Sequence, residues 1–356
     1  MVPRMLRNAE MLDAKANFPF TELEDLRAAG ALYAVVPQRF DGLGLGTEPS
    51  GAIGALHLLR LIGFGNLAVG RIFEGHMNAL RLISLYGGEK QVRRAADDVR
   101  AGHLFAIWNT ERPPEAVRIV KTPAGLALKG SKFFCSAAGY ATRGLITAKT
   151  EEDMQQMLLI GLQPGERAHS IESMTQGMRA TATGRIDFDG LPIESGDFIG
   201  GNDDYLREPA FSGGAWRTCA VTLGGVEALI ESARQQLVDR RRHQSPFQQA
   251  RMGRAFIACQ TIRLWTIHAA RIAENNEARP EEIAAYVNFT RTAAEASALE
   301  IIRLIQQSIG LAAFMDPSPI ERLIRDLSTY LRQPAPDEAL TEAAAWFIEQ
   351  GLPLLE

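Results

Sequence analysis

Two stretches of the sequence carry residue types suited to binding a phosphate. Arg240, Arg241 and Arg242 form its densest basic run, and a guanidinium fork matches the oxygens of a phosphate. Because three adjacent arginines cannot share one helical face, the run is also typical of a solvated helix end, and both interpretations stay open. Gly42 to Gly46, GLGLG, has the wrong spacing for a Rossmann loop. Five residues, PQRFD, also separate it from the apolar run LYAVV, whereas a Rossmann loop follows its strand directly. The GLGLG stretch does not predict a dinucleotide site.

The residue pattern favours neither metal ligation nor nucleophilic catalysis. The six histidines form no His-x-x-x-His pair, and the three cysteines contain no Cys-x-x-Cys pair, so we predict no metal site and no disulfide framework. No serine stands in a Gly-x-Ser-x-Gly motif. His76, on an apolar helix in EGHMNAL, is more typical of a hydrogen-bonded packing residue than of a ligand or a base.

Composition excludes several classes of partner. A formal charge of -4 and a pI near 6.0 give no concentrated basic surface for nucleic acid or for an anionic membrane. The sequence has no run of about 18 apolar residues and no apolar signal core at its start. The lack of such apolar segments, together with cysteines that form no pair motif, predicts a soluble protein of a reducing cytoplasm.

The elements that must position any site fall into three blocks. Capping signals and helical periodicity predict mainly helices in residues 1–103, the first over 21–33. Short alternating runs with turn signals predict a β domain in 104–203, including a hairpin turn at Thr122 to Gly125. Long alanine-rich helices return in 204–356. These three ranges are the predicted domains.

The third block reads as a helical bundle. Apolar residues recur at alternating steps of three and four in three stripes, which begin at Val226, Ala258 and Ala294. Such stripes favour antiparallel packing, which could extend across a subunit interface. Because helices and strands are segregated, a βαβ enzyme fold is excluded. We predict an α+β multi-domain protein with N-terminal helices, an antiparallel β-barrel-like middle and a C-terminal four-helix bundle.

Several phrases, in order over some three hundred residues, resemble the acyl-CoA dehydrogenase superfamily of flavoproteins. DLRAAGALYAVVPQRFDGLGL is similar to that family's early helix and its Pro-x-x-Tyr/Phe-Gly-Gly-x-Gly stretch. AIWNTE resembles its flavin segment, and LKGSKFFCSAAGYATRGLITAKT its following strand pair. MRATATGRIDFDGLPI and QSIGLAAFMDPSPIERLIRDLSTY resemble the close of its β domain and its late Gln-x-x-Gly and Arg-Asp helices.

The resemblance implies an FAD cofactor between the β domain and the C-terminal helices. By position, Asn109 and Thr110 would bond the edge of the isoalloxazine through backbone and hydroxyl groups. Phe134 stands where the family usually has a tryptophan against the ring, and Ser136 keeps the hydroxyl near the reactive nitrogen. Such donors stabilise the negative charge of reduced flavin. Without the resemblance, Thr110 and Phe134 would read as ordinary structural residues.

The same resemblance implies an oligomer. Arg240 matches an arginine that reaches the FAD pyrophosphate of a neighbouring subunit, and Gln307 and Gly310 match the family's Gln-x-x-Gly contacts. We therefore expect a homodimer or homotetramer with a cofactor site built from two chains. An acyl-CoA substrate and an electron-transfer flavoprotein are the further partners it implies.

The sequence departs from the family most at the catalytic base. Many members have a glutamate after the Arg-Asp helix, where this chain has Pro334. Another branch of the family has its base in the helix that opens the C-terminal domain, where this chain has Trp216. Asp337 is the remaining candidate, although PDEAL also predicts a helix start there. The loop after Glu111 departs too, since RPPEAV replaces a Gly-Ser-Asp loop.

These observations leave three functional interpretations. The first is FAD-dependent α,β-dehydrogenation of an acyl thioester, with Asp337 as the candidate base. The second is a monooxygenase of the same fold that uses reduced flavin and oxygen and needs no such base. The third is a non-catalytic flavin-binding homologue.

Overall fold

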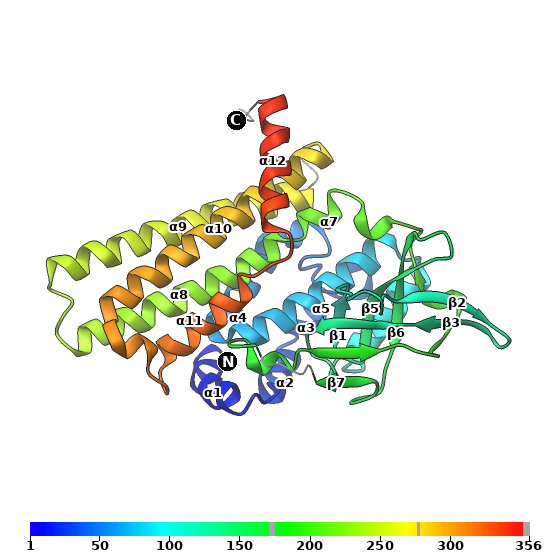
Figure 1. Cartoon of the computed structure of the whole chain (residues 1–356), viewed down its shortest axis with the longest axis horizontal. Helices are drawn as coiled ribbons and strands as arrows, with labels where there is room; N and C mark the ends of the chain where they lie inside the picture. The colour runs from blue at the N-terminus through cyan, green and yellow to red at the C-terminus, as the bar shows by residue number, and fades with distance from the viewer. Residues whose placement is uncertain (171–174, 276–277, 352–356) are drawn as a thin grey trace.

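A computed structural model describes residues 1–170, 175–275 and 278–351 of the chain. Helices come first, two sheets follow, and long helices end the chain (Figure 1). This order confirms the predicted α+β architecture of N-terminal helices, a central β region and a C-terminal helical region. The exact domain boundaries, at 103/104 and 203/204, stay predictions.

The N-terminal region is built from helices whose ends follow local sequence signals. Asn66 caps α5, because its side chain accepts hydrogen bonds from the amides of Ala68 and Val69. The single helix predicted over 21–33 is wrong: Gly30, at φ 75°, separates α2 from α3. The helices are α1 (Val2–Ala14), α2 (Phe20–Ala28), α3 (Ala31–Ala34), α4 (Ala52–Gly65), α5 (Leu67–Tyr86) and α6 (Glu89–Arg100).

The β region holds a seven-stranded sheet in the order β10-β6-β5-β2-β3-β9, with β1 also paired to β5, and a three-stranded sheet, β4-β8-β7. Most pairings are antiparallel as predicted, but β1 and β2 each pair with β5 in parallel. The hairpin predicted at Thr122 to Gly125 is confirmed, since these two residues are partners across β2 and β3. The strands are β1 (Phe105–Trp108), β2 (Arg118–Thr122), β3 (Gly125–Lys129), β4 (Ser131–Cys135), β5 (Arg143–Lys149), β6 (Gln155–Gly161), β7 (Ala168–Ser170), β8 (Gly184–Asp187), β9 (Pro192–Ile193) and β10 (Phe198–Ile199).

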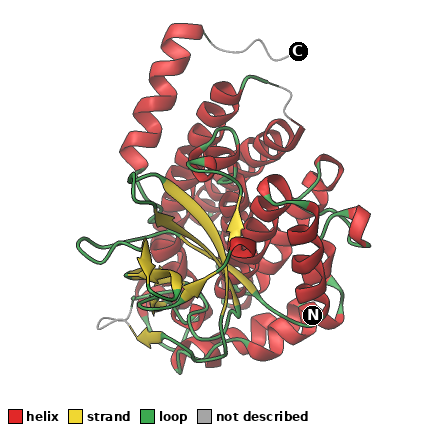
Figure 2. Ribbon diagram, turned by 90° about the vertical axis from the view of Figure 1, so that its right-hand side faces the viewer, coloured by secondary structure: helices red, strands yellow, loops and turns green. Residues whose placement is uncertain are grey.

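The C-terminal helices pack around α8, which contacts α4, α9, α10 and α11 (Figure 1). Figure 2 shows the strands to one side of the helices. The stripe predicted from Val226 is buried at Val226, Leu229 and Leu237. The predicted break is also confirmed, because α11 ends at Tyr330 and α12 begins at Pro336. The helices are α7 (Ala210–Gly213), α8 (Trp216–Asp239), α9 (Pro246–Asn275), α10 (Pro280–Ile309), α11 (Pro319–Tyr330) and α12 (Pro336–Gln350).

In the described parts of the chain, no single helix is both long enough and apolar enough to cross a membrane. Only residues 280–314 taken together with α11 pass that test of length and composition, and this pair is bent by 118°.

Candidate functional site

A cavity of about 320 Å³ lies where α5, the end of β1, the start of α8, α10 and the loop before α12 meet. It combines aromatic, amide, hydroxyl and guanidinium groups, a mixture typical of a small-molecule site. Its lining residues are Arg71, Glu74, Asn78, Arg81, Leu82, Ile107, Trp108, Asn109, Thr110, Phe133, Phe134, Tyr205, Ala210, Phe211, Gly214, Ala215, Arg217, Thr218, Arg291, Gln333 and Pro334.

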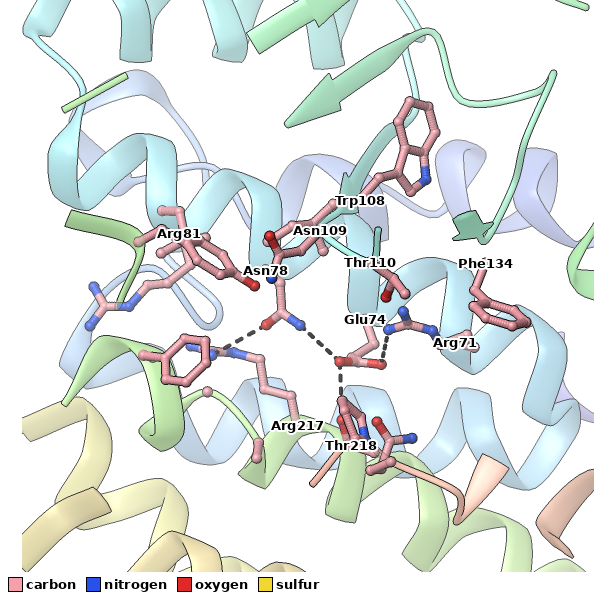
Figure 3. Close-up of a pocket in the computed structure, with 18 of the residues that line it drawn as sticks. Arg71, Glu74, Asn78, Arg81, Trp108, Asn109, Thr110, Phe134, Arg217 and Thr218 are labelled. Atoms are coloured by element: carbon pink, nitrogen blue, oxygen red, sulfur yellow. Dashed lines mark hydrogen bonds and ion pairs between the residues drawn. The ribbon is translucent and has the colours of Figure 1, made fainter. Parts of the chain in front are cut away.

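A polar stripe on α5 forms one wall of this cavity. Arg71, Glu74, Asn78 and Arg81 follow one another at steps of three, four and three, so they lie on one face of an otherwise largely buried helix (Figure 3). Polar residues are rarely buried unless they have partners, so the stripe has to be matched by groups on other elements.

Glu74, 3% exposed, is the centre of those partnerships. Its Oε2 lies 2.8 Å from Nη1 of Arg71 and accepts the hydroxyl of Tyr330 at 3.0 Å. Its Oε1 accepts hydrogen bonds from Asn78 Nδ2 at 2.8 Å and from Thr218 Oγ1 at 3.1 Å (Figure 3). A carboxylate offers about four lone-pair directions, and all are used here.

Behind this wall, Arg217 and Glu274 form a buried ion pair, with 2.5 Å between Arg217 Nη2 and Glu274 Oε1. Arg217 also donates to the carbonyl of Gly46 at 3.0 Å, which ties the glycine-rich loop to α8. Glu274 accepts the indole N–H of Trp216 at 3.1 Å and pairs with Arg81 at 3.3 Å. Trp216, at the second position considered for a base, is fully buried and does not line the cavity.

The opposite wall comes from the end of β1, the residues that follow it, and β4. Phe134 has a positive φ of 53°, and its ring is 47% exposed although it lines the cavity. The Thr110 side chain is exposed too, and among the residues the structure describes its hydroxyl has no hydrogen-bond partner. An exposed aromatic ring beside a free hydroxyl can hold a flat polar ring system by stacking and hydrogen bonding.

A fully buried lysine holds that wall in place. Lys132 on β4 lies 2.5 Å from Oε1 of Glu111 and donates to the carbonyl of Asn109 at 3.1 Å and to Thr147 at 3.0 Å. Burial lowers the pKa of this ammonium group, while the Glu111 hydrogen bond raises it. The Asn109–Glu111 segment is thereby fixed at both ends.

His76 is the packing residue that the sequence predicts. Its Nδ1 accepts a hydrogen bond from the amide of Phe105 at 3.2 Å, so the neutral ring donates from Nε2 to the Leu32 carbonyl, 3.0 Å away. Burial lowers its pKa to about 4. His76 therefore anchors β1 to α5 and does not line the cavity.

The structure brings together only part of the predicted flavin set. Asn109, Thr110 and Phe134 line the cavity, while Ser136, half-buried just beyond, is not among the lining residues; its carbonyl accepts the indole N–H of Trp108 at 2.9 Å. The Asn109 side chain already accepts a hydrogen bond from Thr147.

The other predicted cofactor residues lie elsewhere in the chain. Arg240 follows α8, Gln307 lies in the last turn of α10, and Gly310 comes directly after α10; all three are exposed. The start of α9 is tied to the end of α10 there, since Gln248 on α9 donates a hydrogen bond to the Ser308 carbonyl at 3.2 Å. This is the left end of the bundle in Figure 1, and none of the three residues lines the cavity.

Asp337 does not reach the cavity either. It is exposed in the first turn of α12, where a carboxylate suits the positive end of the helix dipole. Pro334, at the position of the missing glutamate, does line the cavity and offers only its carbonyl, which accepts a hydrogen bond from Arg291.

Sequence reasoning missed the polar stripe of α5, its partner Tyr330, and the cavity-lining residues Tyr205 and Arg291. The stripe does leave a signal, because Arg71, Glu74, Asn78 and Arg81 repeat at helical spacing within apolar neighbours. The residues on other elements leave none that we can identify, since their relevance depends on which helices meet.

Comparisons with known proteins agree with this architecture. Residues 205–331 match the family "Acyl-CoA dehydrogenase, C-terminal domain". A dibenzothiophene monooxygenase from Rhodococcus erythropolis is 26% identical over 196 residues, 52% of this chain and 46% of that enzyme. The chain thus matches about half the length of the first curated relatives.

Two further relatives span almost the whole chain. A 3-sulfinopropanoyl-CoA desulfinase from Advenella mimigardefordensis is 24% identical over 97% of this chain and 90% of its own. The crystal structure of FMN-bound TdsC, a dibenzothiophene monooxygenase from Paenibacillus sp. A11-2, superposes with a TM-score of 0.86 at 17% identity, covering 99% of this chain and 96% of that one. This second likeness shows the fold. With its helical, β and helical blocks in the predicted order, the chain has the fold of the acyl-CoA dehydrogenase superfamily, and its residues 205–331 match the C-terminal domain of that family.

Proposed function

We propose that the protein is a flavin-dependent monooxygenase that acts on a small organic molecule with reduced flavin supplied to it. The observation that carries the proposal is the lack of a free carboxylate among the described residues of the cavity. Glu74 is the one carboxylate in its lining, and Arg71, Asn78, Thr218 and Tyr330 occupy it. A general base needs a free lone pair within reach of the proton that it removes.

The residues of the β1 wall fit a flavin. Phe134 offers an exposed ring for stacking, Thr110 an unbonded hydroxyl, and Lys132 and Thr147 hold the Asn109 backbone and side chain in place. Reduced flavin, when bound, supplies the electrons that activate oxygen, so that one oxygen atom enters the substrate and the other leaves as water. The relatives named as dibenzothiophene monooxygenases, one of which has a crystal structure with FMN bound, support FMN over the FAD expected from the sequence.

The residues of this chain would then bind and orient the substrate instead of abstracting a proton. Tyr205 lines the cavity with its pKa raised by burial to about 12, so its hydroxyl stays protonated. Thr218 and Asn78 are held by Glu74, which fixes the direction of their polar groups. Acyl thioester dehydrogenation, our first expectation, has less support because neither Asp337 nor Trp216 lines the cavity.

The experiment compares the two chemistries on one preparation. Protein reconstituted with FMN or FAD is mixed anaerobically with a panel of acyl-CoA thioesters, and the flavin absorbance is followed. We expect no bleaching. The probes are dibenzothiophene and methanesulfinate, because proteins of the same fold are named as monooxygenases of these compounds. With reduced FMN and labelled oxygen, we expect a product that carries one labelled oxygen atom.

Two outcomes would contradict the proposal. Bleaching by a thioester that is lost in Glu74→Gln would identify Glu74 as a dehydrogenase base. Absence of any bound flavin after reconstitution would reject both enzyme activities. Phe134→Ala is the positive control for the flavin site, and we expect it to weaken flavin binding about tenfold through the lost stacking surface.

A further inference from the structure

The charges around the cavity do not balance. Four of its lining residues are arginines, Arg71, Arg81, Arg217 and Arg291, while Glu74 is the one lining carboxylate that the structure describes. Glu274 adds a second carboxylate from behind the wall, where it pairs with Arg217 and Arg81. Four guanidinium groups thus face two carboxylates. In a partly desolvated site such an excess attracts an anion.

Arg291 carries most of that imbalance. Arg71 pairs with Glu74, and Arg81 and Arg217 share Glu274, whereas Arg291 has no ion pair in the described part of the chain. Its guanidinium donates a hydrogen bond to the carbonyl of Pro334. A guanidinium has five N–H donors, so most of its donors are left for water or a ligand.

The nearest carboxylate on the same helix does not satisfy Arg291. Glu295, one turn further along α10, attracts it but forms its ion pair with Arg332. The pKa of Arg291 is lowered by burial, which means that its charge lacks full compensation by solvent or by the protein. Its bond to Pro334 holds the guanidinium at the loop that lines the cavity.

We propose that the substrate carries an anionic group, a carboxylate, sulfinate or sulfonate, that pairs with Arg291 in this cavity. This inference rests on the proposed function for the identity of the site, and it adds the substrate class. A planar guanidinium fork suits two oxygens of such a group, and the other three arginines favour its approach. The phosphate of the flavin is the other possible source of an anion, and the experiment distinguishes the two.

The test measures binding and requires no turnover. FMN-loaded protein is titrated calorimetrically with ethanesulfonate and with its neutral counterpart of similar shape, ethyl methyl sulfone. We expect the sulfonate to bind at least about tenfold tighter than the sulfone, the size of one charge-assisted contact. Arg291→Gln should lose that advantage, while Arg271→Gln, an exposed arginine of α9 outside the cavity, should keep it.

Arg291→Lys separates charge from the support that Arg291 gives the loop. We expect the lysine variant to retain more sulfonate affinity than the glutamine variant at a similar melting temperature. Three outcomes would each overturn the proposal. They are equal affinity of the wild type for sulfone and sulfonate, wild-type sulfonate affinity in Arg291→Gln, and equal losses of sulfonate affinity in Arg291→Gln and Arg291→Lys.

A second arm addresses the cofactor phosphate. Flavin-free wild type and Arg291→Gln are titrated with FMN and with riboflavin, and we expect the variant to change neither affinity. Weakened binding of FMN alone would assign Arg291 to the cofactor phosphate and overturn the inference. A protein that binds the sulfonate but incorporates no labelled oxygen into either probe with reduced FMN would reject the proposed function and leave this inference standing.

Discussion

Glu74 illustrates how partners decide the role of a single residue. Its carboxylate lies in the cavity, where a base would be useful, but donors from α5, α8 and α11 occupy it. The same residue joins three helices, so its removal would disturb the walls of the site. Glu74 therefore holds the side chains of Thr218 and Asn78 in position.

Replacing Lys132 by methionine should destabilise the protein. The substitution removes a buried ammonium and leaves Glu111, 23% exposed, without its cation, which we expect to cost about 3 kcal/mol in the free energy of unfolding. Lys121→Met is the matched control, because its pair with Glu151 is exposed and should contribute nothing measurable. Urea denaturation of both variants checks this. Similar losses in the two would show that the buried contacts of Lys132 add nothing special.

His76 should make stability depend on pH in a defined window. Between pH 6.5 and about 4, the unfolded chain protonates this histidine while the folded chain does not, so the unfolded state binds more protons and stability rises with pH. The full contribution, about 3 kcal/mol, is present above pH 6.5 and lost as pH falls to about 4.

The measurement compares the pH profile of unfolding for wild type and His76→Gln. Glutamine can keep one donor and one acceptor but does not titrate. We expect a shallower slope for the variant between pH 4 and 6.5, whatever its absolute stability. Identical slopes would mean that His76 does not remain neutral in the folded protein.

Some site residues could be predicted from sequence and others could not. Asn109, Thr110 and Phe134 follow one another in phrases whose order identifies them, and they reach the cavity. Arg291 and Tyr205 stand in ordinary helical and loop sequence, and only the meeting of α10 with the loop before α12 gives Arg291 its position. Counting along the chain leads to Asp337, but it cannot show that α12 starts at Pro336 and keeps this side chain out of the cavity.

At the scale of elements, α11 is the link between the helical and β regions. Asp326 accepts a hydrogen bond from the amide of Met178 at 2.6 Å, and Thr329 accepts one from Gly177 at 3.0 Å. Arg325 pairs with Asp13 of α1 at 2.6 Å. These contacts set the position of Tyr330, whose hydroxyl reaches Glu74 in the cavity wall.

Gly177→Ala should therefore disturb both stability and the site. A β-carbon at Gly177 would lie 2.2 Å from the backbone oxygen of Arg325, so α11 would have to shift, at about 1–3 kcal/mol. Gly196→Ala is the control, since nothing lies within 4 Å of its added carbon. Thermal unfolding and flavin titration of both variants provide the measurement. An unchanged melting temperature of Gly177→Ala would show that α11 can move away from residue 177 at no cost in stability.

Helices and strands could be predicted where a periodic apolar pattern continues over the whole element. The stripe of α8 and the alternation in β8 are local signals, whereas β1 has buried residues on both faces and so shows no alternation. Its parallel pairing with β5 joins residues about forty positions apart, which no local pattern specifies. The break at Gly30 was missed because the flanking residues keep a helical pattern.

At the scale of the whole molecule, the two groups of predicted cofactor residues lie far apart. Thr218 begins α8 beside the cavity, and Arg240 follows its last turn, which the rise of an α-helix puts about 33 Å away. The α9 face next to that end exposes Phe256, Ile257 and Leu264. An apolar surface of this kind is typical of an interface, so the expected homodimer or homotetramer stays our prediction.

A variant of that face tests whether the flavin site needs two chains. Ile257 and Leu264, 70% and 60% exposed, lie two turns apart on α9, and Ile257→Glu/Leu264→Glu would place charges in any interface there. We expect the variant to sediment as a smaller species and to bind FMN about tenfold more weakly, because it loses contacts from Arg240 of a second chain. Leu43→Glu, at a residue 62% exposed in the N-terminal region, should change neither property. If the smaller species binds FMN as tightly as wild type, a single chain holds the cofactor, and Arg240, Gln307 and Gly310 have no part in it.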